Sequence, residues 1–184
     1  MAKQNINSKE GFTIIEVVLV LAIAGLIFLM VFVALPALQR SQRDTARRND
    51  MSRVDTSLIQ YQTNNQDSGD PGDLPKGPAT WDATPAGGFP TGNACNAACK
   101  FVQRYMNAGT DSATNTFKDP DGTYYKVNLG SGAFNGGTLT AMDYTIYIRQ
   151  GAKCQGENAV ADKPRHFAVL YRLEGAGTYC IDDQ

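Results

Sequence analysis

The first feature of the chain is an apolar run near its beginning. From Val17 to Leu35 there are 19 consecutive residues without a charged or strongly polar side chain. As an α-helix this run would be roughly 28 Å long, close to the thickness of the hydrocarbon core of a bilayer. It is longer than the apolar part of a secretory signal, about 7–15 residues, and no small-x-small cleavage pattern follows it. The pattern therefore favours a membrane-spanning helix over a secretory signal.

The helical pattern continues beyond Pro36 with a different character. No glycine or proline occurs from Ala37 to Gln62, and apolar residues recur at spacings of three and four, which places them on one helical face: Met51, Val54, Leu58 and Tyr61. The pattern predicts one helix over residues 12–62, about 75 Å long. Residues 12–35 would lie in the membrane, and the apolar face of the second part would pack on a small globular head.

The opposite face of this second part is charged. It carries Arg43, Arg47, Asp50 and Asp55, and we expect most of these charges to face solvent. Arg43 and Arg47 are an unfavourable like-charge pair one turn apart. Asp44–Arg48 and Asp50–Arg53 have the spacings of favourable helical ion pairs.

Residues 63–122 lack a sustained periodicity. Their first half is rich in proline and glycine and is predicted to be an irregular loop, with Trp81 and Phe89 as anchors or, alternatively, as an exposed recognition surface. A short helix is expected between Asn93 and Gly109, with Cys99, Val102 and Met106 on one side.

Residues 123–184 have the alternating pattern of β-strands. Strands are predicted at 123–129, 142–149, 166–173 and 178–181, joined by glycine-containing loops. Consecutive strands without a long helix between them indicate an antiparallel meander. The predicted fold class is α+β: a long N-terminal helix packed on a small antiparallel sheet.

The charge of the chain is nearly balanced. There are 17 basic and 18 acidic residues, which argues against a general affinity for nucleic acid, and no specific nucleic-acid site is visible. Several arginines, from Arg40 to Arg53, follow the apolar run and outnumber Lys3 and Lys9 before it. Taken alone, this asymmetry would place the C-terminal part in the cytoplasm.

Few residues in the chain suggest catalysis. His166 is the only histidine and has no evident base or metal partner in the sequence, and no P-loop or nucleophile elbow is present. Asp119 and Asp121 belong to the string Asp-Pro-Asp-Gly, which is typical of a turn. Clustered carboxylates also suit Ca²⁺, so these two residues are weak candidate calcium ligands, and no other cofactor is expected.

The N-terminal motif is the most specific in the chain. A short basic leader ends at Gly11, and Phe12, Thr13 and Glu16 then open the apolar helix. This arrangement resembles the type IV pilin family, and more broadly the type IV filament proteins, which include the pseudopilins of type II secretion. The resemblance is strong over about the first 60 residues and covers only the general layout of the rest. The simpler interpretation of Glu16 is a carboxylate at the lipid headgroup level.

The resemblance implies a processing pathway and a function. Residues 1–11 would be a leader removed by a prepilin peptidase between Gly11 and Phe12. Phe12 would then be N-methylated, and Glu16 would pair with the N-terminus of a neighbouring subunit. The protein would span the cytoplasmic membrane once, with its head outside, before an assembly platform and ATPase polymerise it into an extracellular filament.

Four cysteines fit the same resemblance. Cys154 and Cys180 flank the last predicted hairpin, and a disulfide between them would resemble the one that bounds the C-terminal loop of many type IV pilins. Cys95 and Cys99 could form a local bridge in a distorted turn or remain as two thiols. Disulfides favour a location outside the cytoplasm, against the arginine asymmetry.

Three functions follow as hypotheses. The first is a structural subunit of a type IV pilus, or fimbrium, used in adhesion, twitching motility or DNA uptake. The second is a pseudopilin of a type II secretion-like or competence machine, with a head that could bind calcium. The third is a membrane-anchored binding module that never polymerises. None of the three is an enzyme.

Overall fold

The computed structural model describes residues 11–64, 80–82, 97–106, 117–139, 141–175 and 177–183. The chain divides into two compact units, Met1–Gln39 and Arg40–Gln184, and each is described by itself. We refer to the second unit as the head. Residues 1–10 of the predicted leader, Phe89 and Cys95 lie outside the described residues, as do the side chains of Trp81 and Cys99.

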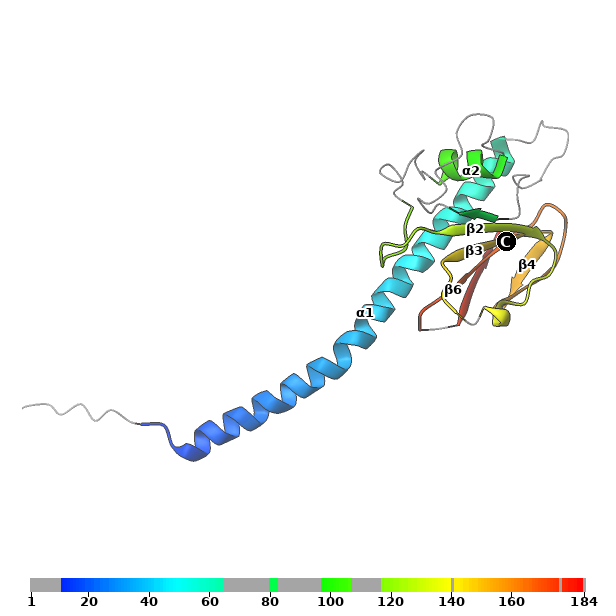
Figure 1. Cartoon of the computed structure of the whole chain (residues 1–184). Helices are drawn as coiled ribbons and strands as arrows, with labels where there is room; N and C mark the ends of the chain where they lie inside the picture. The colour runs from blue at the N-terminus through cyan, green and yellow to red at the C-terminus, as the bar shows by residue number, and fades with distance from the viewer. Residues whose placement is uncertain are drawn as a thin grey trace, which may run out of the picture. The chain divides into compact units, whose positions relative to one another are not determined.

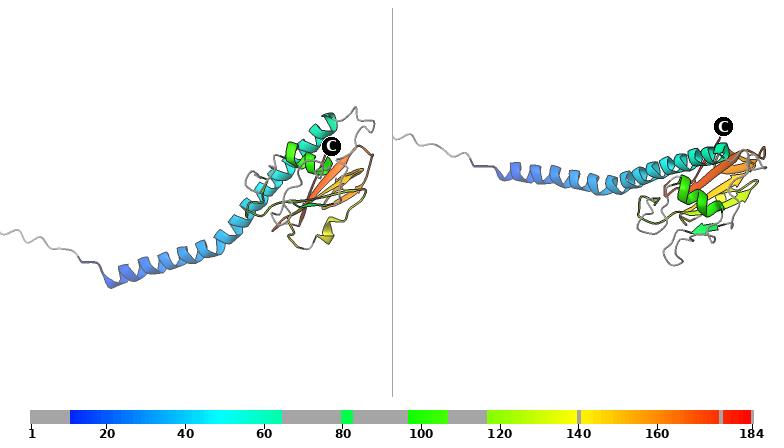
Figure 2. Two further views of the ribbon diagram at one scale, coloured as in Figure 1. Left: turned by 45° about the horizontal axis from the view of Figure 1, so that its top comes forward. Right: turned by 90° about the horizontal axis from the view of Figure 1, so that it is seen from above.

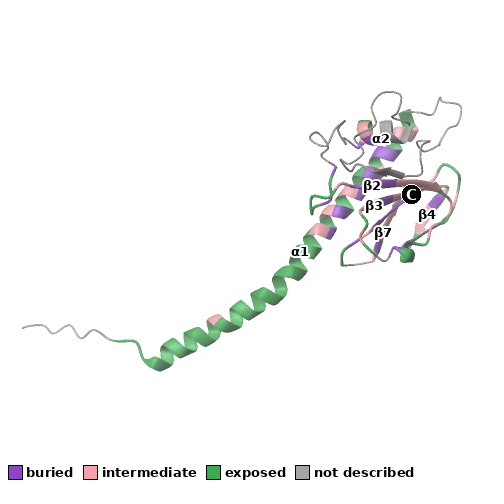
Figure 3. Cartoon of the chain, viewed as in Figure 1, coloured by how far each residue is buried: buried purple, intermediate pink, exposed green. Residues whose placement is uncertain are grey.

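The first element is the helix α1 (Ile14–Asn64), which confirms the long helix expected from the sequence. Pro36 lies inside α1 without ending it. Within the first unit, every residue from Gly11 to Gln39 except Ala24 is exposed, as the green part of the ribbon shows (Figure 3). The most apolar window of α1 has a mean hydropathy of 3.2, so α1 is long and apolar enough to cross a membrane.

The head contains a five-stranded sheet in the order β1-β2-β3-β6-β7 (Figure 1). The strands are β1 (Thr80–Asp82), β2 (Lys126–Ser131), β3 (Thr145–Gln150), β6 (Phe167–Arg172) and β7 (Thr178–Asp182). The last four match the predicted strands to within about three residues at each end. The prediction of an irregular loop over residues 63–122 missed β1, which pairs with β2.

The antiparallel meander predicted for the sheet is wrong at one pairing. β2 and β3 run parallel, whereas the pairs β1–β2, β3–β6 and β6–β7 are antiparallel. Parallel neighbours need a crossover of about a dozen residues or more. The connection between Ser131 and Thr145, which contains the short 3₁₀-helix η3 (Gly136–Thr138), is long enough to provide it. The sheet is therefore mixed.

A second, two-stranded sheet was not predicted. It consists of β4 (Ala152–Gln155) and β5 (Asn158–Ala161), joined by a tight turn in which Gly156 has a φ of +63°. Figure 2 shows the head from two further directions. The two strands pack by Ala152 and Ala159 on Ala168 and Leu170 of β6, which forms a small second core.

The main core lies between the second part of α1 and one face of the five-stranded sheet. Met51, Val54 and Leu58 are fully buried there, and Tyr61 packs against them, as the helical periodicity predicts. The helix α2 (Ala97–Tyr105) contributes Phe101 and Val102, and Met106 directly after it is also buried. The sheet contributes a further set of buried residues: Val127, Ile146, Ile148, Phe167, Val169 and Tyr171.

Candidate functional site

The start of α1 is a capping box formed by Thr13 and Glu16. The backbone N–H of Glu16 donates to Thr13 Oγ1 at 3.3 Å, and the backbone N–H of Thr13 donates to Glu16 Oε2 at 3.4 Å. Thr13 Oγ1 also donates to the same carboxylate oxygen at 3.3 Å. This reciprocal pattern satisfies two N–H groups that a helix start leaves unpaired. This capping box was not predicted, although Thr-x-x-Glu before an apolar run is its sequence signal.

The surface of the first unit, from Phe12 along the apolar part of α1, is apolar and exposed. Phe12 is 87% exposed, Ile14 85% and Phe32 73%. Phe12 and Glu16, the two residues to which the resemblance assigns a role in assembly, lie at the start of this surface. Such a surface is stable only in lipid or against another apolar surface, because water around it is unfavourable.

Two of the arginines after the apolar run, Arg43 and Arg47, participate in a partly buried ion cluster of the head. Arg47, expected to face solvent, is only 1% exposed, and this expectation is wrong. Its Nε and Nη2 donate to the two carboxylate oxygens of Asp119 at 2.7 and 2.8 Å. Its Nη1 donates to Asp44 at 2.9 Å and to Glu174 at 3.2 Å.

Glu174 explains how two arginines one helical turn apart are tolerated. It follows β6 and accepts hydrogen bonds from Arg43 at 2.8 and 2.7 Å as well as from Arg47. These bonds, that from Arg43 first, lower the pKa of Glu174 to about 2. The carboxylate between the two guanidinium groups turns a repulsive pair into an attachment between α1 and the β6–β7 turn.

Asp44 completes the attachment from the helix side. The backbone N–H groups of Glu174 and Gly175 each donate to it at 2.9 Å. Burial alone would raise the pKa of Asp44, but these bonds and the one from Arg47 lower it overall. Asp44 therefore pairs with Arg47 in the structure, at the i,i+3 spacing, whereas the expected partner was Arg48. The other expected pair, Asp50–Arg53, is present at 3.3 Å.

The two candidate calcium ligands occupy the predicted turn. The N–H of Gly122 donates to the carbonyl of Asp119 at 2.8 Å, and Gly122 has a φ of +93°. Both carboxylate oxygens of Asp119 are already engaged, since they accept bonds from Arg47, from the Tyr171 hydroxyl at 3.0 Å and from the N–H of Asp121 at 3.1 Å. Among the residues that the structure describes, no group of three or more His, Cys, Asp or Glu is arranged to hold a metal ion. The cation held by Asp119 in this arrangement is the guanidinium of Arg47.

The predicted disulfide joins Cys154 of β4 to Cys180 of β7, with 5.8 Å between the two Cα atoms. Cys154 was expected in a loop but lies in a strand. The N–H of Cys154 also donates to the carboxylate of Asp182, so the β4–β5 hairpin is attached to β7 by a covalent bond and a hydrogen bond. The bridge thus connects the two sheets of the head.

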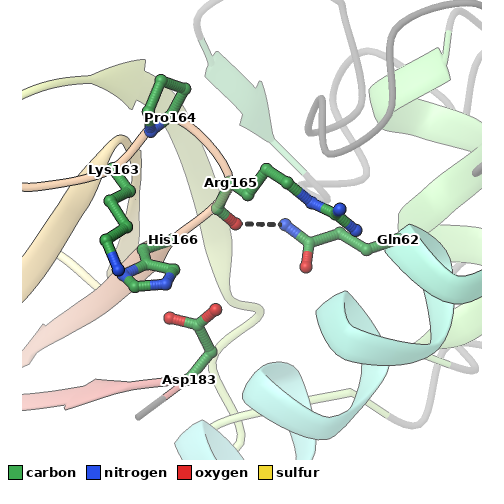
Figure 4. A pocket seen from close by; sticks show the side chains of 6 residues that line it. All are labelled: Gln62, Lys163, Pro164, Arg165, His166 and Asp183. Atoms are coloured by element: carbon green, nitrogen blue, oxygen red, sulfur yellow. Dashed lines mark hydrogen bonds between the residues drawn. The ribbon is translucent and has the colours of Figure 1, made fainter.

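His166, the only histidine, lines an open cleft of about 560 Å³ (Figure 4). The other lining residues are Gln62 of α1, Lys163, Pro164 and Arg165 of the β5–β6 connection, and Asp183. His166 Nδ1 lies 2.7 Å from a carboxylate oxygen of Asp162, and Gln62 donates to the carbonyl of Arg165 at 2.9 Å. None of the described residues that line the cleft carries a hydroxyl or thiol group.

Comparison with known proteins identified no relative of this chain. No protein-family model, curated protein or solved structure matches the chain. The structure is that of an α+β protein with one long N-terminal helix, which is apolar enough to span a membrane, and a head whose two sheets are joined by a disulfide.

Proposed function

We propose that this protein is a subunit of a type IV filament, made as a membrane-anchored precursor and polymerised through the apolar part of α1. The observation that carries the proposal is the N-terminal arrangement itself. Gly11 and Phe12 are exposed directly before a capped helix whose next 19 residues, Val17 to Leu35, carry no charge. A filament core of identical helices would bury this surface again once it leaves the membrane.

Glu16 has a specific place in this proposal. A carboxylate among apolar helices needs a cation, and the N-terminal ammonium of Phe12 on a neighbouring, processed subunit would supply one. The capping box shows that Glu16 also has a purely local role at the helix start. A loss of filaments in a Glu16→Ala variant could therefore have two causes.

Three variants separate these causes in the native host. Glu16→Gln keeps the acceptor of the capping box and removes the charge, whereas Thr13→Ala removes the N-cap and keeps the charge. Glu16→Ala removes both functions of the glutamate. Filaments are sheared from the cells, counted by electron microscopy and identified by mass spectrometry.

If charge pairing drives assembly, Glu16→Gln and Glu16→Ala both lose filaments and Thr13→Ala retains them. Abundant, normal filaments from Glu16→Gln would contradict the proposed pairing of Glu16 with the N-terminal ammonium of a neighbouring subunit. The absence of this protein from any surface fibre of the unmodified strain would count against the filament itself.

The location of the head follows from the same proposal. The Cys154–Cys180 bridge suits an oxidising compartment outside the cytoplasm. The arginines that would argue for the opposite orientation include Arg43 and Arg47, which have a structural role in the ion cluster.

A pseudopilin is the second candidate of the same class, because the string Asp-Pro-Asp-Gly-Thr-Tyr-Tyr at residues 119–125 resembles one in the major pseudopilins. Whether neighbouring genes encode a secretin with a secretion ATPase or a retraction motor would distinguish the two.

A further inference from the structure

The guanidinium of Arg149 lies on the face of the sheet opposite to the main core. Arg149 of β3 is half-buried, and it forms no ion pair and donates no hydrogen bond within the described part of the chain. The buried polar atoms without a partner in that part are Asp55 Oδ1 and Gln103 Nε2, so the nitrogens of Arg149 reach solvent. Its donors are available to a ligand.

The surroundings of Arg149 hold its side chain in place. Its neighbours across the sheet are two of the smallest residues, Gly130 on β2 and Ala168 on β6. The guanidinium lies over Gly130, where a Cβ atom would overlap its Nη1. Cζ of Arg149 is 4.5 Å from the ring centroid of Phe134 and 5.6 Å from that of Tyr147. The two rings are stacked, with centroids 4.9 Å apart.

Asn128 adds a second polar group to this face. It is the register partner of Tyr147 in the parallel β2–β3 pair, so both side chains lie on the same side of the sheet. Its amide is half-buried and makes no hydrogen bond within the described residues. We call the set formed by Asn128, Phe134, Tyr147 and Arg149 the Arg149 platform.

Packing alone does not account for a charge at this position. Burial lowers the pKa of Arg149 because it weakens the hydration of the guanidinium. The two rings compensate for this only in part, because cation–π contacts at partly exposed sites are weak. A methionine could cover the same rings without losing any hydration of a charge. A role in recognition explains both the charge and the unused donors.

We propose that the Arg149 platform binds a carboxylated sugar unit of an acidic polysaccharide. The planar guanidinium can hold a carboxylate through two parallel hydrogen bonds, and the Asn128 amide can donate to and accept from hydroxyl groups. The parts of the two rings that are covered neither by each other nor by the second core offer an apolar surface to the C–H groups of the sugar ring. This activity is separate from filament assembly and does not depend on it.

A single-stranded nucleic acid could also stack on aromatic rings beside an arginine. The Arg149 platform disfavours this ligand, because proteins that bind nucleic acid neutralise several phosphates with lysines and arginines. The platform has one guanidinium, which is enough for the carboxylate of one sugar unit. Nucleic-acid binding is therefore the alternative outcome of the test.

The test is isothermal titration calorimetry on the full chain in detergent micelles. The probes are an oligosaccharide of glucuronic acid, a glucose oligosaccharide of the same length and a single-stranded oligonucleotide. We expect the acidic sugar to bind at least about tenfold more tightly than the neutral one, since only the former can use the guanidinium fork. Equal affinities for the two sugars, or tighter binding of the oligonucleotide, would overturn the proposal.

Variants locate the binding. Arg149→Met removes the charge and keeps the packing, and Gly130→Ala keeps the charge but displaces the guanidinium from its place over β2. Lys118→Met is the matched control, because the Lys118 ammonium also lies over a ring, 4.6 Å from the centroid of Tyr124, away from the platform.

Both platform variants should weaken binding of the acidic sugar about tenfold or more, with the control unchanged. Non-reducing peptide mapping of the Cys154–Cys180 bridge verifies the fold of each variant. An equal loss of binding in the Lys118→Met control, or unchanged binding in either platform variant, would contradict binding at the Arg149 platform.

Discussion

Asp55 is the carboxylate of the head whose surroundings suit its charge least. Its Oδ1 is buried without a hydrogen-bond partner in the described part of the chain. Burial, followed by the charges of Asp183 and Asp182, raises its pKa from 3.8 to about 6. Because the folded state holds this proton more tightly than the unfolded state, Asp55 favours folding at low pH, and this contribution is lost as the pH rises from about 4 to 6.

We therefore expect Asp55→Asn to stabilise the protein at neutral pH by about 1–2 kcal/mol and to have little effect near pH 4. Urea unfolding of the full chain in detergent, at pH 4 and pH 7.5, measures this difference. Glu157→Gln, at an exposed carboxylate, is the control. A stability change of the same size at both pH values would contradict the prediction.

Glu174 acts in the opposite direction and in a lower pH range. Its pKa is lowered to about 2 in the folded state, so its contribution is present above about pH 4.5 and is lost as the pH falls toward 2. The two carboxylates therefore affect stability in separate pH ranges, and an Asp55 variant leaves the acid-induced loss below pH 4 in place.

At the scale of elements, the second part of α1 is attached to the rest of the head by an apolar face and by a buried arginine. Arg47 is 1% exposed and contacts three carboxylates. Removing one partner of a buried ion pair leaves the other charges buried without compensation.

We expect Arg47→Met to destabilise the head by about 3–5 kcal/mol, because Asp119 and Asp44 lose their main cation. Arg53→Met is the control, since Arg53 is 59% exposed and its pair with Asp50 should contribute less than about 1 kcal/mol. Chemical unfolding of both variants compares the two. Equal effects would show that the cluster contributes no more than a surface ion pair.

The disulfide is a second attachment, between the two sheets. A double Cys154→Ser/Cys180→Ser variant should lower the stability of the head by about 2–4 kcal/mol, because the unfolded chain gains conformational freedom. It should also make the C-terminal strand β7 sensitive to protease. Limited proteolysis followed by mass spectrometry checks this, and an unchanged cleavage pattern would count against it. Processing at Gly11 should not change.

The elements were predictable where the signal is local. The apolar face of Met51, Val54 and Leu58 and the alternation in β3 and β6 identified α1 and most strands, because periodicity alone decides them. The β4–β5 hairpin has a local signal too, a turn starting at Gly156 between two short runs, which was overlooked.

Features that depend on residues far apart in the chain could not be predicted from local periodicity. Arg47 occupies a charged helix face, and its burial depends on Asp119 and Glu174, which are 72 and 127 positions away in the chain. The alternating pattern of a strand likewise does not specify which strand pairs with it or in which direction, so the parallel β2–β3 pairing was not predicted. The platform at Arg149 was missed for the same reason, since Gly130 and Phe134 meet it only in the fold.

At the scale of the whole molecule, the proposed function predicts the mature chain. We expect it to begin at Phe12 with an N-methyl group, because the exposed Gly11–Phe12 bond separates a polar leader from the apolar helix. Intact-mass spectrometry of protein from the native host measures this directly. A mature protein that retains Met1 to Gly11 would defeat the prediction, and the double cysteine variant serves as a control with the same N-terminus.

The position of Glu174 in the chain has a consequence for biosynthesis. One partner that neutralises Arg43 and Arg47 is Glu174, which follows β6 and lies 131 and 127 positions after them in the chain. If the head is exported as proposed, these arginines have no Glu174 to pair with until the chain through β6 has crossed the membrane. Contacts of such long sequence separation also form late in folding. We therefore expect the head to complete its folding only after β6 and Glu174 have been made, so that chains terminated before Glu174 expose unpaired charges to quality-control proteases.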